Sequence, residues 1–161
     1  MKKVSFADME CSIARSLEIV GEWWTLLIVR DAFMGVTRFD DFARRLGIAR
    51  NVLTNRLDTL VEHGVLARVP YEDGERPRFD YRLTDKGKAL WPVITTLRQW
   101  GDEWVVGEGN EPVLLEHQAC GHTTTAHLAC EHCGERLERR EVRAVPGPGL
   151  SDPTLLERAR R

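Results

Sequence analysis

Arg38-Phe39-Asp40-Asp41-Phe42-Ala43-Arg44-Arg45-Leu46-Gly47 is the stretch that decides the fold of this chain. Its apolar residues Phe39, Phe42 and Leu46 recur at spacings of three and four, which predicts a short amphipathic helix. Gly47 ends this helix, and residues 48–50 supply a tight turn before a second helix over 51–63. Two short helices joined by a glycine-containing turn are typical of a helix-turn-helix.

The residues that follow extend this unit with a hairpin. The second helix has an apolar stripe of leucines and a valine, and Gly64 is expected to end it. Residues 65–71 and 78–83 are rich in β-formers and flank the turn-forming segment 72–77, so they predict a β-hairpin. The expected fold class is therefore mainly α with a small β-hairpin wing (α+β), a winged helix-turn-helix. The alternative, a small α+β domain of no particular function, requires five elements to agree in order and spacing by accident.

A winged helix-turn-helix places its second helix in the DNA major groove, so double-stranded DNA is the expected partner. Asn51, Thr54 and Asn55 are the side chains expected to reach base edges. Phosphate contacts need a basic face, although the whole chain has a net charge of −2. The arginines expected to make those contacts lie around the turn and at the wing: Arg38, Arg44, Arg45, Arg50, Arg56, Arg76 and Arg78.

Composition limits the other possibilities. The chain has 161 residues, of which 42% are hydrophobic and 30% charged. It contains no apolar run of about 18–20 residues that would span a bilayer, and Lys2-Lys3 is not followed by the apolar stretch of a signal peptide. We therefore expect a cytoplasmic protein without a membrane partner. In that compartment, the four cysteines indicate thiolate chemistry or metal binding rather than structural disulfides.

The flanking segments predict a dimer. Residues 6–20 and 23–33 are expected to be helices, the second apolar nearly all round and therefore buried on most sides. Thr84 is a candidate N-cap for a long helix over 84–104, kinked at Pro92, whose apolar side chains include Leu97, Trp100 and Trp104. This stripe exceeds what so small a domain can bury, so a homodimer through the N-terminal helix and the 84–104 helix is expected. In the alternative, the helix packs only on its own wing domain.

Several motifs in these segments resemble the HxlR family of transcriptional regulators, over about 8–104. They are Cys11-Ser12-Ile13-Ala14-Arg15-Ser16-Leu17, Gly21-Glu22-Trp23-Trp24-Thr25-Leu26-Leu27, Leu53-Thr54-Asn55-Arg56-Leu57 and Tyr81-Arg82-Leu83-Thr84-Asp85-Lys86-Gly87. The resemblance implies a dimeric winged helix related to the MarR group, acting as repressor or activator on a palindromic operator. Glu22 stands where the family usually has lysine, and Ala49-Arg50-Asn51 replaces a common Ser-Pro-Lys. Because the second departure lies where bases are read, the operator sequence does not carry over.

Cys11 is a candidate redox sensor. In some members that this chain resembles, a cysteine at the matching N-terminal position senses electrophiles or oxidants. A lone cysteine in an amphipathic helix is otherwise a small buried hydrophobe. Arg15 and Glu10 flank it with opposite charges, and no second thiol lies nearby in sequence, so its partner would be Cys11 of the other subunit or a small molecule.

The tail predicts a zinc-ribbon-like extension. His117-Gln118-Ala119-Cys120-Gly121 and Cys130-Glu131-His132-Cys133-Gly134 are two ligand-x-x-ligand-Gly units. Three thiolates and one imidazole form the closed tetrahedral set of a structural Zn²⁺ site. The predicted ligands are His117, Cys120, Cys130 and Cys133, with His122 as the alternative fourth ligand. The competing interpretation is a disordered tail whose cysteines stay free or oxidise.

These features divide the chain into a winged helix domain over 8–104, a linker over 105–112, the zinc-ribbon-like extension over 113–145 and a flexible or short helical end over 146–161. A DNA-binding regulator is the expected function. The alternative is a small thiol or metal protein that acts as an oxidoreductase or as a protein-interaction module. An enzyme is disfavoured because there is no phosphate loop, no paired carboxylate site and no βαβ context around Cys130.

Overall fold

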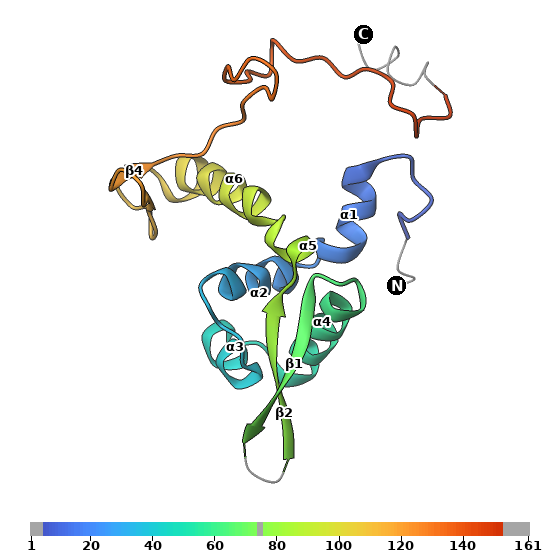
Figure 1. The fold of residues 1–161 in the computed structure, drawn as a ribbon, viewed down its shortest axis with the longest axis vertical. Helices are drawn as coiled ribbons and strands as arrows, with labels where there is room; N and C mark the ends of the chain where they lie inside the picture. The colour runs from blue at the N-terminus through green and yellow to red at the C-terminus, as the bar shows by residue number, and fades with distance from the viewer. Residues whose placement is uncertain (1–4, 74–75, 153–161) are drawn as a thin grey trace. The chain divides into compact units, whose positions relative to one another are not determined.

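The computed structural model describes residues 5–73 and 76–152, with the backbone alone at 72, 73, 76 and 77 (Figure 1). The chain forms two compact units, one up to Ile94 and one from Thr95, so the boundary precedes the expected linker over 105–112. The elements of the first unit are α1 (Ser12–Val20), α2 (Trp23–Phe33), α3 (Phe39–Leu46), α4 (Arg50–Glu62), β1 (Leu66–Asp73), β2 (Arg76–Leu83) and α5 (Asp85–Lys88). Helix α6 (Trp91–Gly101) crosses the boundary and is followed by the π-helical turn η1 (Asp102–Val106), β3 (Leu115–His117) and β4 (His122–Thr124). None of the helices in these ranges has the length and apolarity to cross a membrane.

The predicted helix-turn-helix is confirmed in α3 and α4, within one residue at each helix end. Acidic residues occupy the first turn of α3 and arginines its last turn, which suits the helix dipole. Gly47 ends α3 with φ at 62°, and its N–H donates to the Ala43 carbonyl at 3.0 Å. A side chain would strain this left-handed conformation, so glycine is what lets the chain turn tightly into α4.

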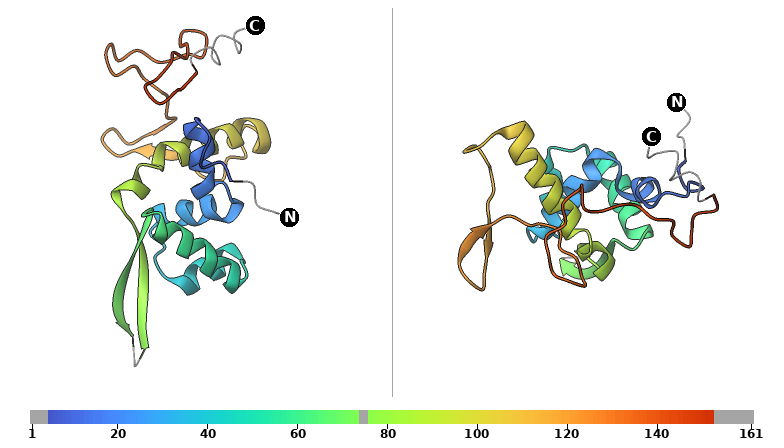
Figure 2. Two further views of the ribbon diagram at one scale, coloured as in Figure 1. Left: turned by 90° about the vertical axis from the view of Figure 1, so that its right-hand side faces the viewer. Right: turned by 90° about the horizontal axis from the view of Figure 1, so that it is seen from above.

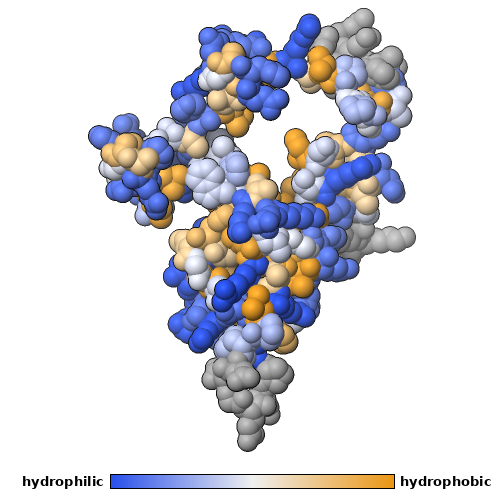
Figure 3. All heavy atoms as spheres, viewed as in Figure 1, coloured by the Kyte–Doolittle hydropathy of each residue, from blue (hydrophilic) through white to orange (hydrophobic). Residues whose placement is uncertain are grey.

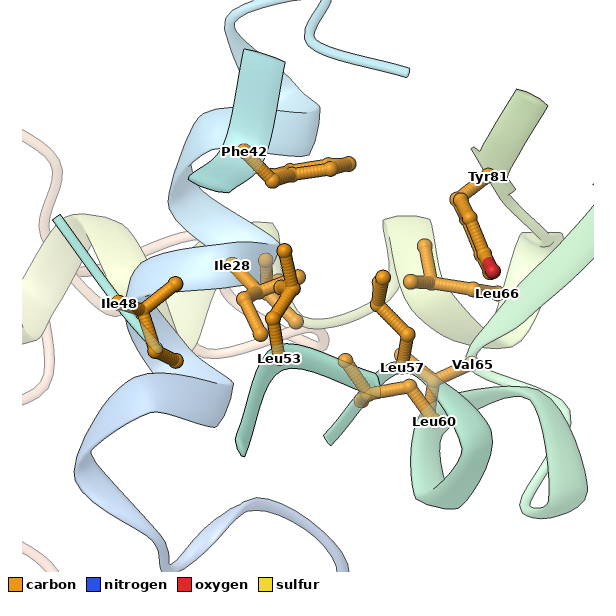
Figure 4. Packing of buried hydrophobic residues seen from close by; sticks show 10 residues of the cluster. Ile28, Phe42, Ile48, Leu53, Leu57, Leu60, Val65, Leu66 and Tyr81 are labelled. Carbon is orange, nitrogen blue, oxygen red and sulfur yellow. The ribbon is translucent and has the colours of Figure 1, made fainter. Parts of the chain in front are cut away.

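The core of the first unit lies where α2, α3, α4 and the hairpin meet. Phe42, Leu53, Leu57 and Leu60 are completely buried, as is Ile28 of α2. Figure 4 shows these side chains pointing toward one another, with Val65 and Leu66 from β1 and Tyr81 from β2 closing the cluster. Burying each large apolar side chain contributes about 1.5–3 kcal/mol, so this cluster fixes α4 against the rest of the unit. The leucine stripe predicted for α4 is confirmed.

The predicted wing is confirmed as the antiparallel hairpin β1–β2, and it is longer than expected. Its register runs from Leu66 opposite Leu83 to Asp73 opposite Arg76, and the hairpin extends away from the helices (Figures 1 and 2). The expected loop over 72–77 was wrong, because pairing continues until two residues separate the strands.

A short bridge that the sequence did not reveal joins the start of α3 to the wing. Arg38 pairs with Asp80 of β2, and the Tyr81 N–H donates to the Thr37 carbonyl at 2.7 Å. The Thr37 hydroxyl also donates to the Asp80 carboxylate at 3.2 Å. These bonds fix the angle between the wing and the helix-turn-helix.

Two expectations about the flanking helices were wrong. Residues 6–11 are not helical, because this segment folds back on α1: Arg15 donates to the Met9 carbonyl at 2.8 Å and Glu18 accepts from the Phe6 N–H. The helix expected over 84–104 is interrupted between α5 and α6, since Pro92 lacks an N–H and is accommodated only in a first helical turn. The expected burial of α2 on most sides is confirmed, because its residues are buried or half-buried except Trp23 at its start and Arg30. The predicted cap is confirmed, with the Thr84 hydroxyl accepting from the Gly87 N–H at 3.1 Å.

In the second unit, the hairpin β3–β4 and the segment after it are tied to α6. The Gln99 side chain accepts from the Ala126 N–H at 2.8 Å and donates to the Ala126 carbonyl at 2.9 Å. Arg98 pairs with Asp102 and donates to the Val113 carbonyl. On the face drawn in Figure 3, hydrophobic residues reach the surface among hydrophilic ones, in keeping with the many exposed apolar side chains of the tail.

Candidate nucleic-acid interface

The front of α4 presents the side chains expected to read bases. Asn51, Thr54 and Asn55 are all exposed, as predicted. The Thr54 hydroxyl donates to the Arg50 carbonyl at 2.9 Å, which is an ordinary helix contact. The two asparagine side chains have no hydrogen-bond partner among the residues that the structure describes. Their amides are therefore available to a base edge, for which asparagine offers both a donor and an acceptor.

A hollow of about 560 Å³ lies between α3, the start of α4 and the wing. It is lined by the side chains of four arginines and two aspartates, together with aromatic rings. The arginines are Arg38, Arg44, Arg50 and Arg78. Positive charge therefore exceeds negative charge here, although the chain as a whole is acidic. This is the placement of charge that a phosphate-contacting surface needs.

Arg50 is held in this hollow by a carboxylate and an aromatic ring. Its guanidinium lies 2.7 Å from the Asp40 carboxylate and 4.7 Å from the centre of the Phe39 ring. The hydrogen bond and charge of Arg50, with smaller contributions from Arg78 and Arg44, hold the pKa of Asp40 below its usual value. The Asp40 carboxylate thus remains ionised and orients Arg50 at the start of α4.

Two of the predicted phosphate contacts have structural partners within the chain. The Arg45 Nε lies 3.3 Å from the carboxylate of Asp31, which is completely buried and also pairs with Arg30 at 2.8 Å. Arg56 lies 3.6 Å from Glu22, with its side chain only 24% exposed. These ion pairs fasten α3 and α4 to the rest of the unit, so both arginines hold the interface in place whether or not they also touch phosphate. The side chain of Arg76 falls outside the described residues.

Cys11 is exposed and immediately precedes α1. Its exposure does not fit the alternative interpretation, in which a lone cysteine on an amphipathic helix is a small buried hydrophobe. Arg15, which the sequence placed one turn away, is turned toward the Met9 carbonyl.

The first ligand pair of the tail lies at the tip of the hairpin β3–β4. The His117 Nδ1 is 3.4 Å from the Cys120 sulfur. The turn is closed by the N–H groups of Cys120 and Gly121, which donate to the His117 carbonyl at 3.1 and 2.8 Å. His122 is paired with His117 across the hairpin, and its Nδ1 contacts the Cys120 carbonyl at 2.8 Å.

The second ligand pair lies in a similar turn. The Gly134 N–H donates to the Cys130 carbonyl at 2.8 Å, and Ala129 is bridged to Arg136. The backbone N–H groups of Cys133 and His132, followed by the Cys133 side chain, hold the pKa of Cys130 below its ordinary value. Over the described ranges, no group of three or more His, Cys, Asp or Glu side chains is arranged around a common point for a metal. The four predicted zinc ligands therefore form two pairs rather than one quartet.

Comparison with known proteins identifies the family to which this architecture belongs. A model of the HxlR-like helix-turn-helix family matches residues 19–108. The HTH-type transcriptional regulator Rv3095 of Mycobacterium tuberculosis is 49% identical over 139 residues, which cover 86% of this chain and 87% of that protein. Because at most 108 of those 139 residues can precede position 109, at least 31 lie beyond the family match. At least part of the tail is thus aligned with this relative.

Two solved structures extend the comparison. The candidate transcription factor PA1607 is 39% identical, with a TM-score of 0.79, and the match covers 89% of this chain and 100% of that one. The redox regulator HypR in its reduced form is 27% identical, with a TM-score of 0.52, over 56% of this chain and 90% of that one. Its oxidized form is 28% identical with the same TM-score. With a family match over more than half of its length, and with these relatives, the chain belongs to the HxlR-like helix-turn-helix family of transcriptional regulators and is not an enzyme.

Proposed function

We propose that this chain binds a palindromic operator as a homodimer, with α4 in the major groove and the wing beside it. The observation that carries the proposal is the pair of exposed asparagines at the front of α4, next to the arginine-lined hollow. Asparagine supplies base readout, and the arginines supply phosphate contacts that set register. Dyad symmetry would place two copies of α4 about 34 Å apart, one turn of DNA.

The dimer is supported by apolar side chains that remain exposed in the single chain. On α1, Ile13 is 73% exposed and Leu17 is 47% exposed, one helical turn apart. On α6 and η1, Leu97, Trp100 and Trp104 are 49%, 57% and 69% exposed. Exposed apolar stripes of this kind mark interaction sites. We assign it to the second protomer.

The test is a binding assay on the DNA upstream of the chain's own gene, with an unrelated duplex for comparison. Asn55→Ala should weaken operator binding by about 1–3 kcal/mol and leave binding to the unrelated duplex nearly unchanged. Asn110→Ala, the same change in the predicted linker, is the control and should bind as the wild type does. Equal losses on both duplexes would show that Asn55 does not read a base.

We further propose that binding responds to oxidants through Cys11. The exposure of this thiol and the likeness to HypR, which was solved in reduced and oxidized forms, support this. Two Cys11 thiols of a dimer would form one disulfide, passing two electrons and two protons to an oxidant such as a hydroperoxide. Treatment with peroxide should change operator affinity of the wild type but not of Cys11→Ser, and non-reducing electrophoresis should show the cross-linked dimer. An unaltered response in Cys11→Ser would remove Cys11 from the mechanism, and a mass adduct without cross-linking would indicate a small-molecule thiol partner.

A further inference from the structure

The tail contains two turns that are near copies of each other. In each, a glycine N–H donates at 2.8 Å to the carbonyl of the residue four positions earlier, from Gly121 to His117 and from Gly134 to Cys130. Both glycines have left-handed backbone angles, with φ of 69° and 74°. In both turns, the first and fourth residues carry a nitrogen or sulfur donor: His117 and Cys120, then Cys130 and Cys133. A turn alone would need the glycine, but it would not need metal-binding side chains at these same two positions.

The segment with these turns has no core of its own. From 102 to 152, a range described throughout, no residue is buried. Leu128 is 63% exposed and Leu137 is 37% exposed, although both belong to the strand-like pairing around the second turn. A chain that orders two hairpin turns without burying apolar side chains needs another source of stability, and a structural metal supplies it in small domains of this kind.

From these observations we propose that His117, Cys120, Cys130 and Cys133 bind one structural zinc ion that joins the two turns into a ribbon. Three thiolates and an imidazole suit the tetrahedral preference of Zn²⁺ and leave no open position for a substrate. On binding, each thiol that is protonated gives its proton to solvent, and the completed site has a net charge of −1. The proposal concerns the tail and is independent of the DNA contacts of α4.

The chain between the pairs is long enough for this closure. Gln99 holds Ala126 to α6 through two hydrogen bonds, and Ala126 is four residues from both His122 and Cys130. Each four-residue arm reaches about 13 Å when extended. A reversal at Ala126 would therefore bring Cys130 back beside His122, next to the first turn, without breaking the contact with Gln99.

The local contacts favour His117 as the fourth ligand over His122. The His117 Nδ1 already faces the Cys120 sulfur at 3.4 Å, so a small shift would place an ion between them. His122 instead uses its Nδ1 on the Cys120 carbonyl.

The experiment uses the full chain, purified under reducing conditions without chelators. Elemental analysis should find about one zinc per chain in the wild type and in Cys11→Ser, the matched control outside the tail. Cys120→Ser, Cys130→Ser and Cys133→Ser should each lose most of the metal while keeping the unfolding transition of the winged helix, whose core lies entirely before residue 95. A thiol reagent should react with one cysteine in the zinc-loaded wild type and with all four after chelation.

The outcomes are decisive in both directions. Wild-type protein without zinc, or a full zinc complement in Cys120→Ser, would overturn the ribbon, the latter because it would leave Cys130 and Cys133 binding alone. His117→Ala should lose zinc in competition with a chelator, whereas His122→Ala should retain it. The reverse result would overturn the assignment of His117.

Cobalt substitution gives an independent readout. The sulfur-to-metal absorption of the cobalt-loaded protein should fall with each Cys→Ser replacement in the tail and remain unchanged in Cys11→Ser.

Discussion

Gly87 shows how tightly a single residue can be constrained in this fold. It is buried where α5 approaches the start of β1 and the end of β2. A Cβ atom at this position would lie 2.2 Å from the Val65 carbonyl oxygen and 2.9 Å from a Leu83 methyl carbon. That carbonyl also accepts the Thr84 N–H at 3.1 Å, so it cannot move without loss of the hydrogen bond that ends β2.

We therefore expect Gly87→Ala to lower the free energy of unfolding by about 1–3 kcal/mol, the usual cost of overpacking. Gly101→Ala is the matched control, because nothing lies within 4 Å of a Cβ atom there and its backbone is helical. That change should be neutral or stabilise by up to about 1 kcal/mol. Denaturant unfolding of both variants gives the comparison, and equal effects would contradict the close approach at Gly87.

The sequence predicted some residue environments and missed others. Periodicity was enough to identify Leu53, Leu57 and Leu60 as buried, because neighbours on one helix face are fixed by helix geometry. The ion pairs Arg45–Asp31 and Arg56–Glu22 were not predictable, since each joins helices whose relative placement depends on the whole core. Exposure of the side chains proposed to read bases followed from the same periodicity that identified the core.

At the scale of elements, α3 and α4 carry arginines of two kinds. Arg50 is 70% exposed and paired with an exposed aspartate at the edge of the hollow. Arg45 is 49% exposed, and its partner Asp31 is fully buried between α2 and α3. The first arginine can exchange its partner for a phosphate at little structural cost, whereas the second holds α3 against α2.

Arg50→Ala should therefore reduce the slope of log affinity against log salt by about one unit, with little change in stability. Arg45→Ala should lower the free energy of unfolding by about 1–3 kcal/mol, because a buried carboxylate loses one of its two charged partners. Salt titrations of DNA binding and denaturant unfolding of both variants separate the two roles. A destabilised Arg50→Ala with an unchanged salt slope would contradict the assignment of Arg50 to phosphate.

Element boundaries were predictable where local chemistry decides them. Gly47, Gly64 and the Thr84 cap mark real ends, because a left-handed glycine or a capping hydroxyl acts on its own neighbours. The start of α1 was not predictable, since residues 6–11 are held by Arg15 and Glu18 in contacts that periodicity does not show. The bridge between Arg38 and Asp80 is another such contact, because its two residues lie on either side of the helix-turn-helix in the sequence.

At the scale of the whole molecule, the apolar residues between 90 and 104 divide along the chain, with the packed ones at the start of α6 and the exposed ones toward its end. Leu90 and Ile94 pack against the core of the first unit, and Thr95 is buried. Leu97, Trp100 and Trp104 follow at spacings of three and four and remain exposed, so they form an exposed apolar stripe beyond the packed residues. Aromatic side chains of this kind are enriched in the buried centres of protein interfaces. A second protomer that covers this stripe would also fix the distance between two copies of α4.

Trp100→Asp tests this assembly, because a carboxylate at the centre of an apolar interface would have to be buried without a partner. We expect a folded monomer with weak operator binding, since a single half-site loses the contribution of the second α4. Trp91→Asp is the matched control: nine residues earlier at about 100° per residue, Trp91 lies on the opposite face of α6 and is also exposed, at 46%. Light scattering at micromolar concentration should show a dimer for the wild type and for Trp91→Asp, and circular dichroism should confirm that all three proteins are folded.

A dimeric Trp100→Asp would move the interface away from this stripe, toward Ile13 and Leu17 of α1. A monomeric wild type would leave the two half-sites of a palindrome to be filled independently, and the salt slope and affinity would then be those of one winged helix.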